Sequence, residues 1–265
     1  SYHVVTADGV SAATALDGFV VTSGLADGND WEASGGGVYS QYGSRMTLSN
    51  VIVSGNRGFS GGGMYNNGDA SLSRVVFSGN RADTGGGMHS NGSPTLNDVR
   101  FSDNYAVAGG GMANYGDSTL NNVVFRGNVT QGGPGAGIYN HFQATIALAE
   151  AVFSDNHATI DRGGGVCNEG NISLTNVVLS GNRSAATGGA VHNSGSATLT
   201  NALLSGGHAV SGGGVYGIRG ELILNNVTVA GNLADESGGG IYLSDSSPVL
   251  ANCIVWGNVA PAGPQ

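Results

Sequence analysis

The sequence contains no lysine: its nine cationic residues are all arginines, against 18 acidic residues. The resulting net charge of −9 argues against nucleic acid and anionic lipid as partners, because both are themselves negatively charged. Only 10% of the residues are charged, whereas about 25% is usual. The acidity favours solubility and predicts no nucleic-acid partner, but it does not identify a ligand.

Long apolar runs and cysteines are also scarce. No run approaches the roughly 20 apolar residues of a membrane helix, so we expect no direct membrane insertion by a helix. The two cysteines, Cys167 and Cys253, are too few for a disulfide scaffold, and we expect them not to pair with each other. The chain begins at Ser1 without a basic-then-apolar leader, and we expect it to be a mature or excised segment of a larger protein.

Glycine, by contrast, supplies 49 of the 265 residues, and much of it recurs at fixed positions. Small-residue triplets begin every 24–28 residues, an asparagine closes nearly every unit, and a leucine stands eight residues before that closing position. Repeats of this period indicate a solenoid, a propeller or an array. The triplets begin at Gly35, Gly61, Gly85, Gly109, Gly135, Gly163, Gly188, Gly212 and Gly238, and the asparagines are Asn56, Asn80, Asn104, Asn128, Asn156, Asn182, Asn232 and Asn258, with Gly207 in place of one.

Each unit has room for three short strands and three turns but not for a helix. In residues 61–84 the alternating stretches centre on Met64, on Leu72 and on Val75 to Phe77. A propeller blade needs about 40 residues, and a leucine-rich repeat would show a helix-compatible half. We therefore predict an all-β, right-handed parallel β-helix of about nine or ten coils, the handedness following from the crossover rule.

This solenoid is predicted to form one domain over residues 1–265. Residues 1–34 would form an N-terminal cap or first coil with an acidic loop, residues 35–258 the regular coils, and residues 259–265 a tail. The asparagines are expected to stack at one corner as a ladder of amides, and the glycine triplets to mark another corner. The first unit carries Leu25 where an asparagine is expected.

The repeat motifs resemble a known family. The strings FSGN (77–80), FSDN (101–104), FRGN (125–128) and FSDN (153–156) match the FxxN motif of polymorphic outer-membrane protein repeats, and GGAV (188–191) matches their GGA[ILV] motif. The resemblance covers about residues 16–258 and extends to β-helix proteins of bacterial surfaces. It implies a secreted or cell-surface passenger, often adhesive and cut from a larger polypeptide.

One column of polar and aromatic side chains is predicted to point outward from the first strand of each coil. Such rings could bind sugars by stacking, or could simply stack on one another between coils. The candidate ligand-binding residues are Tyr39, Tyr65, His89, Tyr139, His192, Tyr216 and Tyr242.

Irregular spacing is concentrated in residues 129–169, where the gaps from Asn128 and Asn156 to the next triplet are the longest. Insertions in solenoids often gather on the binding face. Carboxylates near an arginine could support polysaccharide cleavage by general acid/base chemistry, although these residues fall in different columns. The candidate catalytic residues are Glu150, Asp155, His157, Asp161 and Arg162.

An acidic loop precedes the first triplet. The oxygen-bearing side chains of Asp27, Asn29, Asp30 and Glu32 suit calcium, although the spacing is not that of a known calcium loop. Calcium is the one cofactor that the sequence suggests, and a solvated turn is the alternative.

An apolar stripe on the outside of the third strand could contact a partner, or could reflect strand propensity. It comprises Ile52, Val76, Val124, Val152, Val178, Leu203 and Ile254. The predicted partners are a glycan or a surface protein of a host or neighbouring cell, and self-association would use the coil ends or this stripe. The predicted function is a non-catalytic extracellular adhesion or scaffold module, with a polysaccharide lyase or hydrolase of the pectin-lyase-like type as the alternative.

Overall fold

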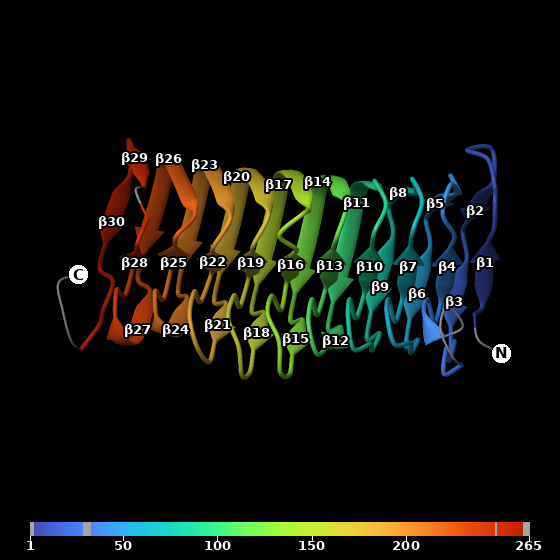
Figure 1. Cartoon of the computed structure of the whole chain (residues 1–265), viewed down its shortest axis with the longest axis horizontal. Coiled ribbons are helices and arrows are strands. Elements are labelled where there is room, and N and C mark those ends of the chain that lie inside the picture. The colour runs from blue at the N-terminus through green and yellow to red at the C-terminus, as the bar shows by residue number, and fades with distance from the viewer. Residues whose placement is uncertain (1–2, 29–32, 247, 262–265) are drawn as a thin grey trace.

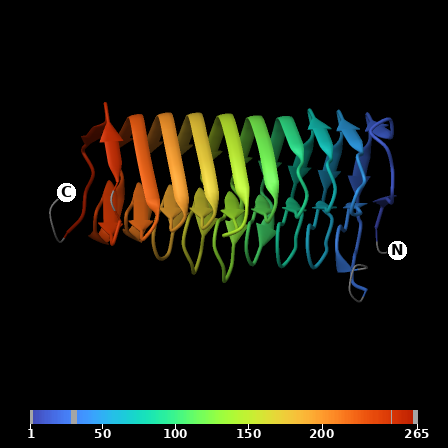
Figure 2. The ribbon, with the colours of Figure 1, turned by 45° about the horizontal axis from the view of Figure 1, so that its top comes forward.

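The computed structural model describes residues 3–28, 33–246 and 248–261. The chain winds around one long axis, so that its N-terminal and C-terminal coils lie at opposite ends of a rod (Figure 1). Each coil lies directly against the next, and the strands of successive coils line up as sheets along the rod (Figure 2). The described residues contain no helix suited to crossing a membrane.

Within the described residues, sheet A consists of ten parallel strands, one from each successive coil. Each of its strands follows a glycine-rich corner, except the first. In the central strands, one side chain points into the core and the next points outward. The strands are β1 (Val5–Ala7), β4 (Val38–Ser40), β7 (Met64–Asn66), β10 (Met88–Ser90), β13 (Met112–Asn114), β16 (Ile138–Asn140), β19 (Val166–Asn168), β22 (Val191–Asn193), β25 (Val215–Ile218) and β28 (Ile241–Ser244).

Sheet B unites the second and third stretches that the sequence predicts as separate strands. From residue 95 onward the two run together as one bent strand, whereas they are separate in the first and last coils. Its strands are β2 (Ala15–Asp17), β3 (Val20–Thr22), β5 (Thr47–Ser49), β6 (Ile52–Ser54), β8 (Ser71–Ser73), β9 (Val76–Ser78), β11 (Thr95–Ser102), β14 (Asp117–Arg126), β17 (Thr145–Ser154), β20 (Asn171–Ser180), β23 (Ser196–Ser205), β26 (Glu221–Ala230), β29 (Val249–Ala251) and β30 (Ile254–Trp256).

Sheet C, which we did not predict, follows the asparagine corner. Most of its strands are only two residues long, too short for an alternating pattern to be visible in the sequence. They are β12 (Tyr105–Ala106), β15 (Val129–Thr130), β18 (His157–Ala158), β21 (Arg183–Ser184), β24 (His208–Ser211) and β27 (Leu233–Ser237). The all-β parallel solenoid is confirmed, but its third sheet lies where the sequence suggests a turn.

Like residues stack upon like residues in the core. Phe77, Phe101, Phe125 and Phe153 are fully buried, and their rings lie parallel with centroids 4.7–4.9 Å apart. The leucine column beside them is also buried from Leu48 to Leu224. This spacing equals the distance between paired strands, so each coil offers the next a matching apolar surface.

The predicted asparagine ladder is present and is fully buried. In its central part, the backbone N–H and the side-chain amide of Asn104 both donate to Oδ1 of Asn128, at 3.1 and 3.0 Å. The same amide also donates to the carbonyl of Phe77 in the preceding coil, at 3.0 Å. The amide of Asn80 donates in turn to Asn104. In this central part, each asparagine thus satisfies the corner backbone and ties its own coil to both neighbours.

Asn104→Leu is expected to lower the free energy of unfolding by about 1–3 kcal/mol, because it leaves buried backbone donors and acceptors unpaired. Chemical denaturation measures this change. Asn97→Ser is the matched control, since Asn97 lies outward in sheet B and Ser73 takes the same position one coil earlier. Equal stability of the two variants would contradict the role of the ladder.

In the first coil the ladder position is occupied by Gly24, not by Leu25. The pairing of β3 with β6 places Leu25 opposite Arg57, one residue beyond Asn56. The backbone N–H of Gly24 donates to Oδ1 of Asn56 at 2.8 Å. The expectation for Leu25 was therefore wrong by one position, because the loop inserted before the first triplet obscures the register.

A second buried ladder, which sequence reasoning missed, runs along the end of sheet A. The amide of Asn140 donates to Oδ1 of Asn168 at 2.8 Å, and that of Asn168 to Asn193 at 2.8 Å. Asn114 joins the same ladder through Asn140. Two amide ladders therefore flank sheet B: the first follows its strands, before sheet C, and the second lies between the end of sheet A and the start of sheet B.

Candidate functional site

The outer face of sheet A carries the column that the sequence predicts to point outward. The strand register places its members directly opposite one another, from Tyr39 to Tyr242. Four of these side chains are nevertheless almost completely buried: Tyr39, His89, Tyr139 and His192 are each at most 9% exposed. Outward direction in this sheet does not mean access to solvent.

The rings cover one another. Tyr39, Tyr65 and His89 stack with centroids 5.4 and 5.1 Å apart, and His192, Tyr216 and Tyr242 stack at 5.2 and 5.0 Å. Because both faces of an interior ring contact its neighbours, those faces cannot also receive a sugar. The geometry supports stacking between coils for these six residues, whereas Tyr139 meets the ring of Tyr115 edge-on, with centroids 6.0 Å apart.

Two rings that sequence reasoning missed complete the stack where a coil has a small residue. Ala113 occupies the aromatic column, and Tyr115 from the same coil lies against His89, with centroids 4.8 Å apart. His141 follows, 4.5 Å from Tyr115. The alanine in an otherwise large-residue column was the available signal.

At the next small residue, Cys167, a charged pair takes the place of the ring. The guanidinium of Arg162 donates to Oε1 of Glu169 at 2.6 Å, and the hydroxyl of Tyr139 donates to Oε2 at 2.8 Å. Burial raises the pKa of the Cys167 thiol to about 12, so it stays protonated and packs as an apolar group. Burial, reinforced by the Glu169 carboxylate, also raises the pKa of Tyr139.

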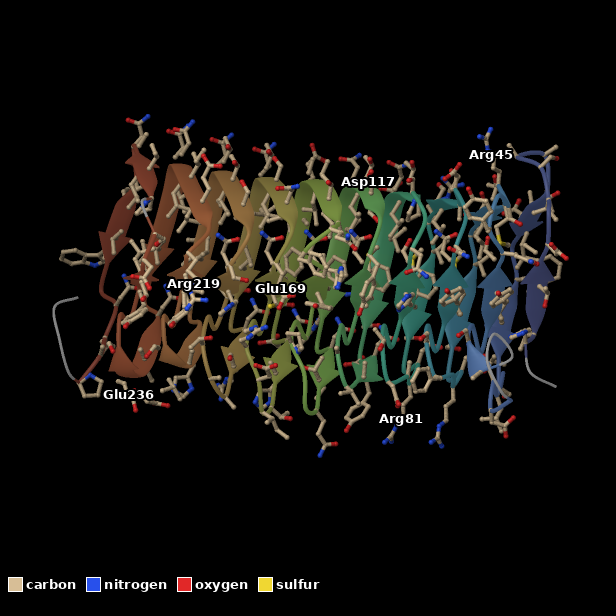
Figure 3. The ribbon with its side chains drawn as sticks, viewed as in Figure 1. Arg45, Arg81, Asp117, Glu169, Arg219 and Glu236 are labelled. Carbon is tan, nitrogen blue, oxygen red and sulfur yellow. The ribbon has the colours of Figure 1, made fainter. Side chains whose placement is uncertain are left out.

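A hollow of about 510 Å³ adjoins this break in the stack. Its floor includes His192 and Tyr216, and Oγ1 of Thr187 lies 2.8 Å from Nδ1 of His192. Burial, with a smaller effect of Arg162, lowers the pKa of His192 to about 3, so the imidazole is neutral. The lining residues are Asp161, Arg162, Ala186, Thr187, His192, Ser194, Tyr216, Ile218 and Arg219. Figure 3 shows Glu169 and Arg219 on the same face of the rod.

The structure does not bring the five candidate catalytic residues together. Glu150 occupies a corner of sheet B with φ of 57°, in the column of Asn122 and Asn176. Asp155 occupies the next corner with φ of 56°, where other coils have glycine. His157 is exposed on sheet C. Only Asp161 and Arg162 line the hollow, so the carboxylates do not form an acid/base pair.

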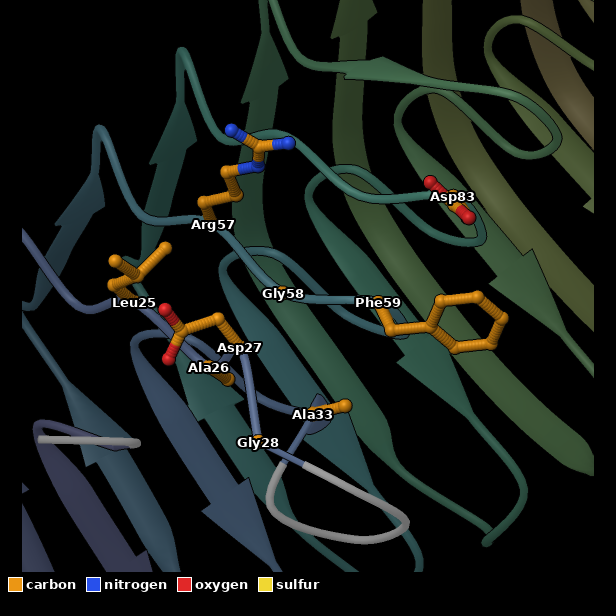
Figure 4. Close-up of a pocket in the computed structure, with 9 residues that line it drawn as sticks. All are labelled: Leu25, Ala26, Asp27, Gly28, Ala33, Arg57, Gly58, Phe59 and Asp83. Atoms are coloured by element: carbon orange, nitrogen blue, oxygen red, sulfur yellow. The ribbon is translucent and has the colours of Figure 1, made fainter.

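The predicted calcium loop is only partly described. Asn29, Asp30 and Glu32 lie outside the described residues, whereas Asp27 lines a second hollow beside Arg57 and Phe59 (Figure 4). Within the described ranges, no group of three or more histidine, cysteine or acidic side chains is arranged to hold a metal ion. The calcium site stays a prediction.

The apolar stripe follows one outward column of sheet B, in which Arg100 and Thr228 are the polar interruptions. Its exposed fractions reach 44% at Ile52 and 60% at Ile254. The last coil adds further exposed apolar side chains, including Trp256 at 76%. Both surfaces are accessible, and self-association through them stays a prediction.

The stacked coils, the buried like-residue columns and the corner ladders define a parallel β-helix. The family model described as "Right handed beta helix region" matches residues 13–167, more than half of the chain, and the chain belongs to this family. The finer resemblance to polymorphic outer-membrane protein repeats is not part of that match. Searches of curated proteins and of solved structures found no significant match.

Proposed function

We propose that this chain is a non-catalytic extracellular or cell-surface module that acts in adhesion or as a rigid scaffold, and that the hollow beside Arg162 is its ligand-binding place. The partner would be a glycan or a surface protein of another cell. Two amide ladders and the stacked core support the scaffold role, because they tie successive coils to one another over most of the rod.

The observation that carries the binding role is the break in the aromatic stack. At Cys167 the repeat gives way to a charged pair, and a hollow with polar walls opens directly beside it. A purely structural rod has no need for this departure, since a tyrosine at position 167 would continue the stack of its neighbours. Insertions into a solenoid repeat map to loops on one face, which is often the binding face.

The alternative is a polysaccharide-active enzyme of the pectin-lyase-like type. The observation in its favour is that Asp161 and the neutral His192 line the same hollow. Against it, Glu150 and Asp155 occupy backbone corners away from that hollow, where their left-handed conformation gives them a structural role.

A panel of acidic and neutral polysaccharides separates the two functions. We expect binding on a glycan array without new reducing ends and without the ultraviolet absorbance of unsaturated products. Reproducible cleavage that is abolished by Asp155→Asn or Asp161→Asn would overturn the non-catalytic proposal. Binding only to cell-surface proteins would leave adhesion in place and remove the glycan.

A further inference from the structure

We infer that the hollow beside Arg162 binds a carboxylate-bearing sugar, with Arg219 as the residue that receives the carboxylate. This inference rests on the proposed binding function and names the ligand class of the same site. Two arginines, Arg162 and Arg219, lie in the walls of this hollow.

Both arginines come from insertions into the repeat. Arg162 belongs to the loop between Asn156 and Gly163, a spacing of seven residues, whereas the corresponding spacing from Asn182 to Gly188 is six and most others are five. Arg219 lies in the corner after β25, where Val215 and Gly220 are five residues apart.

The corresponding distance in the preceding coil, from Val191 to Gly195, is four residues. The added residue in the later coil is Arg219, and it has a φ of 57°, a conformation that costs free energy for a residue other than glycine. Two insertions in different coils and at different corners thus deliver an arginine each to one hollow.

The two arginines differ in their counter-ions. Arg162 is engaged by Glu169, which holds its guanidinium in place. Arg219 is exposed, and within the described part of the chain its side chain forms no ion pair or hydrogen bond. A free guanidinium in a wall that also contains Ser194 and Tyr216 suits a carboxylate, which accepts two parallel N–H bonds from arginine.

The remaining wall groups suit hydroxyls. Asp161 can accept hydrogen bonds, and Thr187 and Ser194 can both donate and accept them. The strands β19, β22 and β25 are successive neighbours in sheet A, so the opposite walls are about 10 Å apart along the rod. A ligand that fills this length and offers both one carboxylate and several hydroxyls is an acidic sugar in a short chain.

The test uses a tetrasaccharide of alternating glucuronate and N-acetylglucosamine, the same tetrasaccharide with its carboxyl groups reduced to alcohols, and a poly-glutamate peptide. Arg219→Asn is the variant, since asparagine accepts the same backbone conformation. Arg74→Asn is the matched control, because Arg74 is also an arginine at positive φ (54°) but lies at a corner of sheet B. Circular dichroism verifies that both variants are folded.

By calorimetry, we expect Arg219→Asn and the loss of the carboxyl groups each to weaken binding about ten-fold or more, and Arg74→Asn to leave it unchanged. Equal binding of the reduced tetrasaccharide, or of the Arg219→Asn variant, overturns the inference but keeps a glycan-binding module. Preference for the peptide overturns the sugar and points to an acidic protein. Absence of binding to all three probes overturns the inference, and absence of any ligand on glycan and cell-surface arrays as well removes the proposed binding function.

Discussion

Replacing Gly92 by alanine is expected to destabilise the fold by about 3 kcal/mol, at the upper end of the cost of overpacking. A β-carbon at this position would lie 1.9 Å from the carbonyl oxygen of Gly68, a backbone atom of the preceding coil. Neither coil can withdraw alone, because ladder and sheet hydrogen bonds fix both. Denaturant unfolding of the purified variant measures the loss.

Gly79→Asp is the control for this substitution. Gly79 has a φ of 61° and no atom within 4 Å of the position that a β-carbon would take. Asp103 and Asp155 hold the equivalent corner in other coils with nearly the same φ, 56°. We expect Gly79→Asp to cost about 1 kcal/mol or less. A loss as large as that of Gly92→Ala would contradict the steric explanation, because it would show that these glycines are needed for their backbone flexibility alone.

Stability is expected to fall as the pH drops below about 6.5. Burial lowers the pKa of His89 to about 4 and that of His192 to about 3, whereas both titrate near 6.5 in the unfolded chain. The unfolded state therefore binds more protons than the folded state below pH 6.5, which favours unfolding. Each histidine contributes up to about 1.4 kcal/mol per pH unit, and this contribution is lost between pH 6.5 and its folded pKa.

The double variant His89→Tyr, His192→Tyr isolates this effect, because neighbouring coils already carry Tyr65 and Tyr216 in the same stack. We expect a clearly smaller slope of unfolding free energy against pH between 5 and about 6.5. Tyr65→Phe, which removes no group that titrates in this range, leaves the slope unchanged. Equal slopes for wild type and the double variant would show that these histidines bind protons as readily in the folded state as in the unfolded chain.

The regular part of the fold was predictable because like residues recur at the same position of successive repeats and so form columns along the rod. Leu72 and Phe77 recur at fixed offsets, and a parallel stack brings equal offsets together, so the core and the Asn104 ladder follow from spacing alone. Sheet C did not follow, since a two-residue strand such as Tyr105–Ala106 carries no periodic signal. Leu25 was misplaced because an insertion leaves two registers open.

The candidate site was only partly predictable, because it lies where insertions and an unusual residue interrupt the repeat. The long spacing before Gly163 indicates Asp161 and Arg162 as site residues, and both line the hollow. Glu150 was included for its charge, although its position in a corner column of asparagines indicates a backbone role. Arg219 was missed although the one-residue insertion before Gly220 is visible in the sequence, because the spacing from each triplet to its leucine also varies in other coils.

Gly207 occupies the ladder position that is an asparagine in the other regular coils, and this has a mechanical consequence for the rod. Its backbone N–H still donates to Asn232 at 2.8 Å, but glycine has no side chain to receive the amide of Asn182, which among the described residues bonds to the carbonyl of Phe153 alone. The rod thus consists of two clamped lengths joined at a weaker seam. Under tension or local fraying, the coils beyond this seam would separate as one unit, while the longer length before it stays wound.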